Sequence, residues 1–160
     1  MRETRRTDHA MPRRIVLTFV TLAVAVTTTA CSHAMMMLHG TGAKRPVASE
    51  FGLGPRASTG GRYVATLELA KPLRPRQMQT VRLVVRDTDG RGIDDAQFSI
   101  DGGIPQHGHG LPTRPRVTRR LGDGVYEIEG VRFNMGGWWE FRLAIAGVRG
   151  TDTVIFNLEL

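Results

Sequence analysis

The sequence has one cysteine, Cys31, so no disulfide can form within the chain. Aromatic residues make up only 6% of its 160 residues. No ten-residue segment combines the apolar spacing of an amphipathic helix with capping residues. The fold must therefore be stabilised by an apolar core alone, and that core is not expected to be built from helices.

The sequence also lacks an apolar run long enough to cross a bilayer. Its longest such run, residues 15–26, has twelve residues, whereas a spanning helix needs roughly 20. Arg13 and Arg14 precede the run, and small residues follow it. This order is typical of a secretory signal, so we predict that residues 1–31 are a signal peptide. Met1 and Met11 are both candidate start sites.

The predicted signal ends in Thr-Thr-Thr-Ala-Cys, which is typical of bacterial lipoprotein signals although Thr28 replaces the usual leucine. We therefore expect lipidation at Cys31 and a protein of the periplasm or cell envelope that is lipid-anchored to the membrane. The alternative is an ordinary secretory signal that is cleaved near Ala30 or Ala34.

Once residues 1–31 are set aside, the chain also lacks a strong excess of charge of one sign. Residues 32–160 carry 17 basic and 13 acidic side chains, interspersed along the chain. Nucleic-acid binding requires a coherent basic stripe, so we do not expect a nucleic-acid partner.

Residues 32–61 contain six glycines, two prolines and no lasting periodicity, which predicts a flexible tether. Within it, three methionines at 35–37 lie between His33 and His39. These are ligand types for Cu(I), although an unstructured segment without metal is the favoured interpretation.

From Arg62 onward, apolar and polar residues alternate in short runs that are separated by turn signals. Tyr63–Leu69, Val81–Val85 and Trp139–Ile145 are the clearest examples. About seven such runs in roughly 100 residues predict an all-β fold. We therefore expect residues 62–160 to form a single immunoglobulin-like antiparallel β-sandwich.

The most unusual stretch is the Gly/Pro-rich segment 101–113, which contains His107 and His109. Two histidines two residues apart point to the same side of an extended backbone. Imidazole binds Cu, Zn and Ni, and a thioether from Met135 would favour copper. A structural zinc site needs four ligands, which this chain does not offer without cysteine. The alternative is that both histidines only hydrogen-bond backbone groups of the loop.

No residue pattern favours an enzyme. Ser99 is the only serine in the predicted domain and falls within a strand, and no glycine-rich loop follows a strand and opens a helix. Asp101 is placed to orient an imidazole, as carboxylates near metal ligands do.

Residues 102–110 (Gly-Gly-Ile-Pro-Gln-His-Gly-His-Gly) and 133–139 resemble the FixH/YtkA-like family of exported β-sandwich domains. The resemblance extends over roughly residues 62–160. The family's loop runs approximately Met-Pro-x-Met-Gly-His; Pro105, Gly108 and His109 match it, while Ile104 and His107 replace the two methionines. The resemblance implies an extracytoplasmic immunoglobulin-like domain and, for the FixH branch, an association with copper delivery during assembly of respiratory oxidases.

Two hypotheses of function follow. The first is an envelope-anchored binding module that holds copper through His107, His109 and Met135. The second is a metal-free protein-interaction module of the periplasm, in which the same loop contacts an envelope protein.

Overall fold

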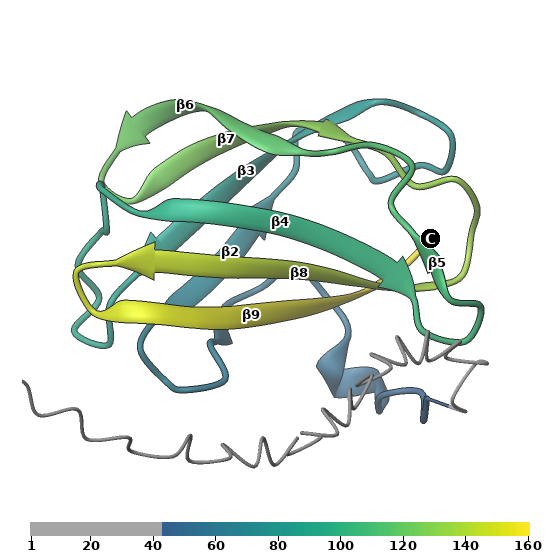
Figure 1. Ribbon diagram of the computed structural model, residues 1–160, viewed down its shortest axis with the longest axis horizontal. Coiled ribbons are helices and arrows are strands. Elements are labelled where there is room, and N and C mark those ends of the chain that lie inside the picture. Colours follow the sequence, from purple (N-terminus) through teal and green to yellow (C-terminus); the bar gives the residue numbers. More distant parts are fainter. Residues whose placement is uncertain (1–42) are drawn as a thin grey trace, which may run out of the picture. The chain divides into compact units, whose positions relative to one another are not determined.

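The computed structural model describes residues 43–160, which all belong to one compact unit. Nine strands form two antiparallel sheets that pack face to face (Figure 1). Apart from the short 3-10 helix η1 (Ala48–Glu50), the described residues form no helix. The predicted all-β sandwich is confirmed. Seven of the strands are longer than two residues, which agrees with the prediction of about seven. The other two strands have two residues each and were not predicted.

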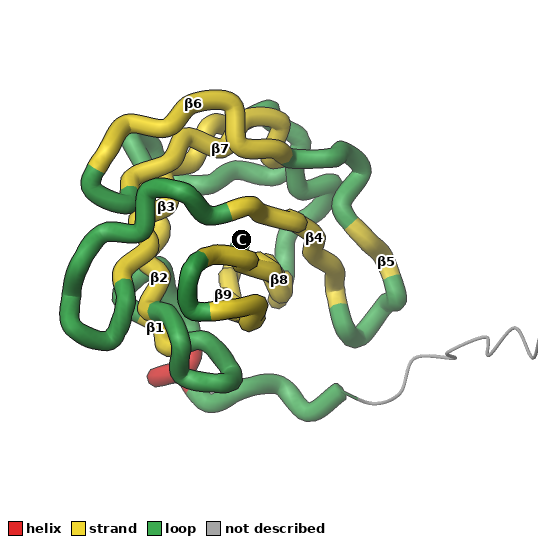
Figure 2. The backbone as a smooth tube through the Cα atoms, turned by 60° about the vertical axis from the view of Figure 1, so that its left-hand side comes forward, coloured by secondary structure: helices red, strands yellow, loops and turns green. Residues whose placement is uncertain are grey.

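The larger sheet has five strands. Its order is β1 (Arg56–Ala57), β2 (Val64–Glu68), β3 (Gln79–Arg86), β7 (Val125–Val131) and β6 (Arg116–Gly122). The smaller sheet has four strands, in the order β5 (His109–Gly110), β4 (Gln97–Ile104), β8 (Trp138–Gly147) and β9 (Gly150–Glu159). Figure 2 shows β5 as a short strand outside β4.

The core lies between the sheets and is formed by the inward positions of the alternating runs. Leu67, Leu83 and Phe141 are 4%, 0% and 1% exposed, as the alternation predicts. Buried aromatic rings contribute to the core, and Phe133 packs edge-on against Trp139 at 5.1 Å between ring centres. The core therefore contains side chains from both sheets.

Trp138 and Trp139 point to opposite faces of β8, as successive residues of a strand must. Trp139 belongs to the core cluster between the sheets. Trp138 is also buried but lies outside that cluster, and its indole N–H donates to Asn157 Oδ1 at 3.0 Å. Of the two tryptophans, only Trp139 therefore packs within the core cluster between the sheets.

The described part of the expected tether, residues 43–61, is attached to the sandwich. Phe51 forms a parallel bridge with Asn157, and the backbone N–H of Leu67 donates to Leu53 O at 2.8 Å. Arg56 and Ala57 then pair with β2. Ordered structure therefore begins before residue 62, because long-range pairing holds a segment that has no periodic pattern. Residues 32–42 of that tether lie outside the described residues.

The connections between strands gather at two ends of the sandwich. Residues 58–63, 87–96, 123–124 and 148–149 form what we term the carboxylate end, on the left of Figure 1. The other end, on the right, is termed the histidine end. It comprises residues 43–55, 69–78, 105–108, 111–115, 132–137 and 160.

Candidate functional site

The histidine-bearing loop is a tight turn between β4 and β5. Ile104 and His109 face each other across the hairpin. The carbonyl of Ile104 accepts the backbone N–H groups of His107 and Gly108 at 3.1 and 3.0 Å. Gly108 has φ +65°, a left-handed conformation that glycine adopts without strain. The turn is therefore closed by backbone contacts alone, and both imidazoles are left outside it.

The two imidazoles lie side by side. The ring centres of His107 and His109 are 6.4 Å apart, with 23° between the ring planes, and both residues are exposed. Two imidazoles that share one metal through bonds of about 2 Å have ring centres roughly 6 Å apart at most. The observed separation slightly exceeds that limit, so both rings could reach one ion only after a side chain rotates and brings them closer. The turn brings the two rings together, whereas the sequence suggested that an extended backbone would do so.

Met135 lies in the loop that leads into β8, at the same end of the sandwich as the histidines. The residue is 41% exposed, and its backbone carbonyl accepts the indole N–H of Trp139 at 3.1 Å. That bond fixes the backbone of the loop against the core. A contact between the Met135 thioether and either imidazole stays a prediction.

Asp101, which the sequence placed to orient an imidazole, contacts a different group. Asp101 pairs with Arg142 at 3.4 Å, and Arg142 also pairs with Glu140 at 2.9 Å. The Asp101 carboxylate is thus bonded to a guanidinium group and not to an imidazole. Asp101, Arg142 and His109 line a shallow hollow of about 280 Å³. Cys31 and the segment from His33 to His39 lie outside the described residues.

No group of three or more His, Cys, Asp or Glu side chains comes together within residues 43–160. A metal bound by the histidine pair would therefore need its further ligands from Met135, from water or from another molecule. Such a donor set does not satisfy a closed zinc site, but it suits copper, which accepts imidazole and thioether ligands.

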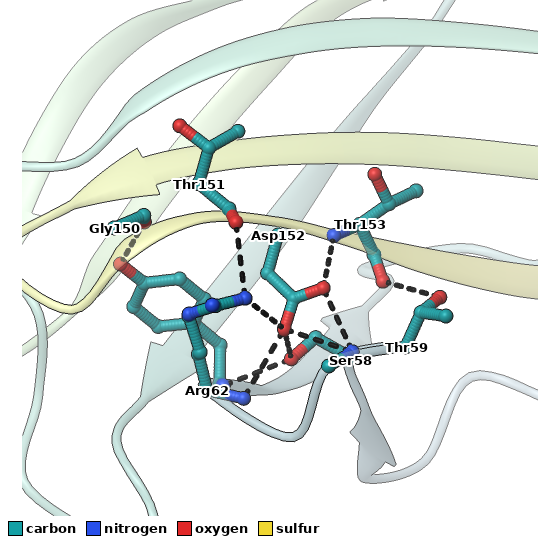
Figure 3. A network of polar contacts seen from close by, with 9 residues as sticks. Ser58, Thr59, Arg62, Gly150, Thr151, Asp152 and Thr153 are labelled. Atoms are coloured by element: carbon teal, nitrogen blue, oxygen red, sulfur yellow. Dashed lines mark hydrogen bonds and ion pairs between the residues drawn. The ribbon is translucent and has the colours of Figure 1, made fainter.

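At the carboxylate end, Asp152 forms a polar network that the sequence analysis did not identify (Figure 3). Ser58 Oγ donates to its Oδ2 at 2.7 Å, and the backbone N–H groups of Gly60 and Thr153 donate to its Oδ1 at 2.9 and 2.8 Å. The Ser58 hydroxyl, followed by these N–H groups, lowers the pKa of the Asp152 carboxyl well below its usual range. The one sequence signal is an aspartate at an inward position of an alternating strand.

Asp87 makes a second such anchor. The backbone N–H groups of Asp89 and Arg91 both donate to its Oδ1 at 2.9 Å, and Arg149 donates to its Oδ2 at 3.0 Å. The bond from Arg91, supported by that from Arg149, lowers the pKa of Asp87. Because Arg149 lies in the β8–β9 turn, this carboxylate joins the two sheets.

The comparisons with known proteins give one match. The family model described as YtkA-like matches residues 58–144, which is more than half of the chain. The chain belongs to the YtkA-like family. The matched part of this YtkA-like domain includes the histidine hairpin and Met135, and it starts at Ser58 of the Asp152 network.

No curated protein and no solved structure matches the chain significantly. Among the described residues of the YtkA-like domain, none forms a helix that is long and apolar enough to cross a membrane.

Proposed function

We propose that this YtkA-like domain is a lipid-anchored module of the cell envelope that binds copper through His107 and His109. The observation that carries the proposal is the pair of exposed imidazoles, 6.4 Å apart, on a turn whose backbone is fixed. Met135 supplies a soft third ligand in the proposal, from a loop at the same end. The resemblance of the loop to the FixH/YtkA-like family supports a role in copper delivery, because the FixH branch of that family is associated with copper delivery.

The ligand number suits delivery better than storage. Copper held by two or three side chains at an exposed turn keeps an open position, to which a receiving protein can add a ligand. A buried site with a full set of ligands would exchange metal slowly. Exposure of both imidazoles is thus an advantage for a carrier.

The test is a competition titration of the full-length, membrane-extracted protein with Cu(I) against a coloured chelator. His107→Ala combined with His109→Ala is expected to lower the affinity by roughly tenfold or more, since even loss of a residue that only supports a ligand has that effect. Met135→Leu is expected to lower it less, because one soft ligand is lost and the imidazoles remain. Unchanged affinity in the double histidine variant would contradict the proposal.

Two control variants make the titration specific. Gln106→Ala changes an exposed residue of the same turn that offers no metal ligand of comparable strength. His33→Ala combined with His39→Ala removes the other histidine pair and leaves 107 and 109 intact. Both controls should bind copper with the affinity of the unmutated protein. If only the variant without His33 and His39 lost copper binding, the copper site would instead lie within residues 33–39.

A metal-free interaction module is the second candidate, because the same turn is a rigid exposed surface. Its backbone is closed by two hydrogen bonds to Ile104, and Pro105 restricts it further. Affinity capture of envelope proteins with and without a copper chelator separates the two functions. A partner that binds equally in both conditions, and whose binding depends on residues 105–108, would favour this second function.

A further inference from the structure

The charged residues of the loops are unequally divided between the two ends of the sandwich. At the carboxylate end the connecting segments hold five acids and three bases: Asp87, Asp89, Asp94, Asp95, Asp123, Arg62, Arg91 and Arg149. At the histidine end they hold seven bases, and Glu50 is the one acidic side chain among these described segments. These bases are Lys44, Arg45, Lys71, Arg74, Arg76, Arg114 and Arg132. The described domain is therefore electrically polar along its strands.

The two ends also differ in how many of their basic side chains are paired with a carboxylate. All three bases of the carboxylate end lie within 4 Å of a carboxylate. Within the described residues of the histidine end, only Arg45 forms such a pair, with Glu159. The β2–β3 loop is the clearest case, because Lys71, Arg74 and Arg76 lie in ten residues that contain no acid. Their charges are available to an anionic partner.

Exposed apolar groups accompany these charges. Met78, in the same loop, is 63% exposed. Leu69 and Leu73 of this loop line an open apolar hollow of about 390 Å³ together with Phe51 and Leu53. Basic side chains beside exposed apolar groups are the combination that binds the interface of an anionic bilayer.

The described chain also begins at this end, since Arg45 contacts Glu159 at the end of β9. Cys31 lies twelve positions before Ala43, and a chain of twelve residue steps extends over at most about 40 Å. A lipid on Cys31 would therefore hold the domain within about 40 Å of the membrane, and the histidine end is the end at which the described chain begins.

We propose that the histidine end lies against a bilayer that contains anionic lipid, with the β2–β3 loop at the contact. This orientation rests on the anchoring at Cys31 proposed above. It places the histidine hairpin at the membrane surface, where a membrane-embedded protein could exchange a ligand with it. The carboxylate end points away from the lipid, because its acidic groups are repelled by the same surface.

The test uses the full-length protein, processed and purified from membranes and reconstituted into vesicles. Gln77→Cys places a polarity-sensitive fluorophore in the β2–β3 loop, and Val148→Cys places one at the opposite end, where Val148 is 73% exposed. One set of vesicles is phosphatidylcholine, and in the other about one third of the lipid is phosphatidylglycerol. Emission from position 77 is expected to shift to shorter wavelength only in the anionic vesicles, while emission from position 148 stays unchanged.

Salt and charge reversal show whether the contact is electrostatic. The shift at position 77 is expected to disappear in about 1 M salt, where charges are screened over roughly 3 Å. Lys71→Glu with Arg74→Glu should also abolish it. Arg82→Glu with Arg120→Glu, two exposed positions in the strands of the larger sheet, makes the same change in net charge and should leave the shift in place.

The proposal is overturned if position 77 emits equally in both kinds of vesicle, or if position 148 shifts instead. The first result is also the one expected if the basic end binds an acidic protein and not lipid. The unmutated protein, passed through the same labelling, reports on the anchor separately. Labelling of its Cys31 would show a free thiol and contradict the lipidation, whatever the orientation of the domain.

Discussion

The two ends of this YtkA-like sandwich are held by different contacts. At the carboxylate end, Asp87 and Asp152 accept backbone N–H groups and tie one sheet to the other through side chains. At the histidine end, the hairpin of residues 104–109 is closed by its own backbone, and both imidazoles are exposed. The difference indicates that the carboxylate end stabilises the fold, whereas the histidine hairpin can change its side chains, and bind through them, at small cost in stability.

Two glycines with similar backbone conformations give the sharpest form of this comparison. Gly124 has φ +70°, and a Cβ atom there would lie 2.2 Å from the carbonyl oxygen of Val85; Gly108 has φ +65°, and a Cβ atom there would meet nothing within 4 Å. Gly124→Ala should lower the free energy of unfolding by about 3 kcal/mol or more. Gly108→Ala should lower it by about 1–2 kcal/mol. Urea denaturation of both variants tests this, and equal losses would mean that the two turns are equally constrained.

The next largest effect is expected for Asp152→Asn. The amide keeps the size of the carboxylate but loses its charge, and it places a donor where donors from Ser58 and Gly60 already point. The melting temperature should fall on the order of 5–10 °C. Asp95→Asn, at an exposed aspartate of the same end, is the control and should melt like the unmutated protein. If both variants melt alike, Asp152 does not have the anchoring role described here.

Stability should also depend on acid pH through this end. The pKa values of Asp152 and Asp87 are lower in the folded protein than in the unfolded chain, so the folded state binds fewer protons. Their contribution is complete above the unfolded pKa of about 4 and is lost as the pH falls toward the folded values. Thermal melts from neutral pH to about pH 2 should show this loss, and Asp152→Asn should reduce its slope. A slope that Asp152→Asn leaves unchanged would assign the acid sensitivity to other carboxylates.

The smallest effect on stability is expected for the proposed ligands. His107→Ala with His109→Ala, without copper at neutral pH, should change the free energy of unfolding by no more than about 0.5 kcal/mol for each exposed side chain. A comparison of the melting temperatures of the double histidine variant and Asp152→Asn tests this prediction. A loss as large as that of Asp152→Asn would instead support a structural role, in which both histidines satisfy backbone groups of the loop.

The sequence predicts the core better than it predicts contacts between distant segments. Alternating apolar residues determine which side of a strand is buried, so Leu67, Leu83 and Phe141 could be assigned to the core from local pattern alone. The proximity of His107 and His109 followed from their spacing, although a turn and not an extended strand produces it. The Asp152 network joins residues 94 positions apart, and no local pattern reports such a pair. For the same reason the two-residue strand at Arg56 was not predicted, since it exists only through its pairing with β2.

The central claim is that ligand binding belongs to the histidine end. The most direct test is an amide NMR titration of the isotope-labelled full-length protein with Cu(I), using the signals of residues 43–160. We expect shifts or broadening at residues 104–110 and around Met135, with the amides around Asp87 and Asp152 unchanged. Shifts centred on residues 58–63 or 147–152, or none at residues 104–110 when copper is in excess, would contradict it.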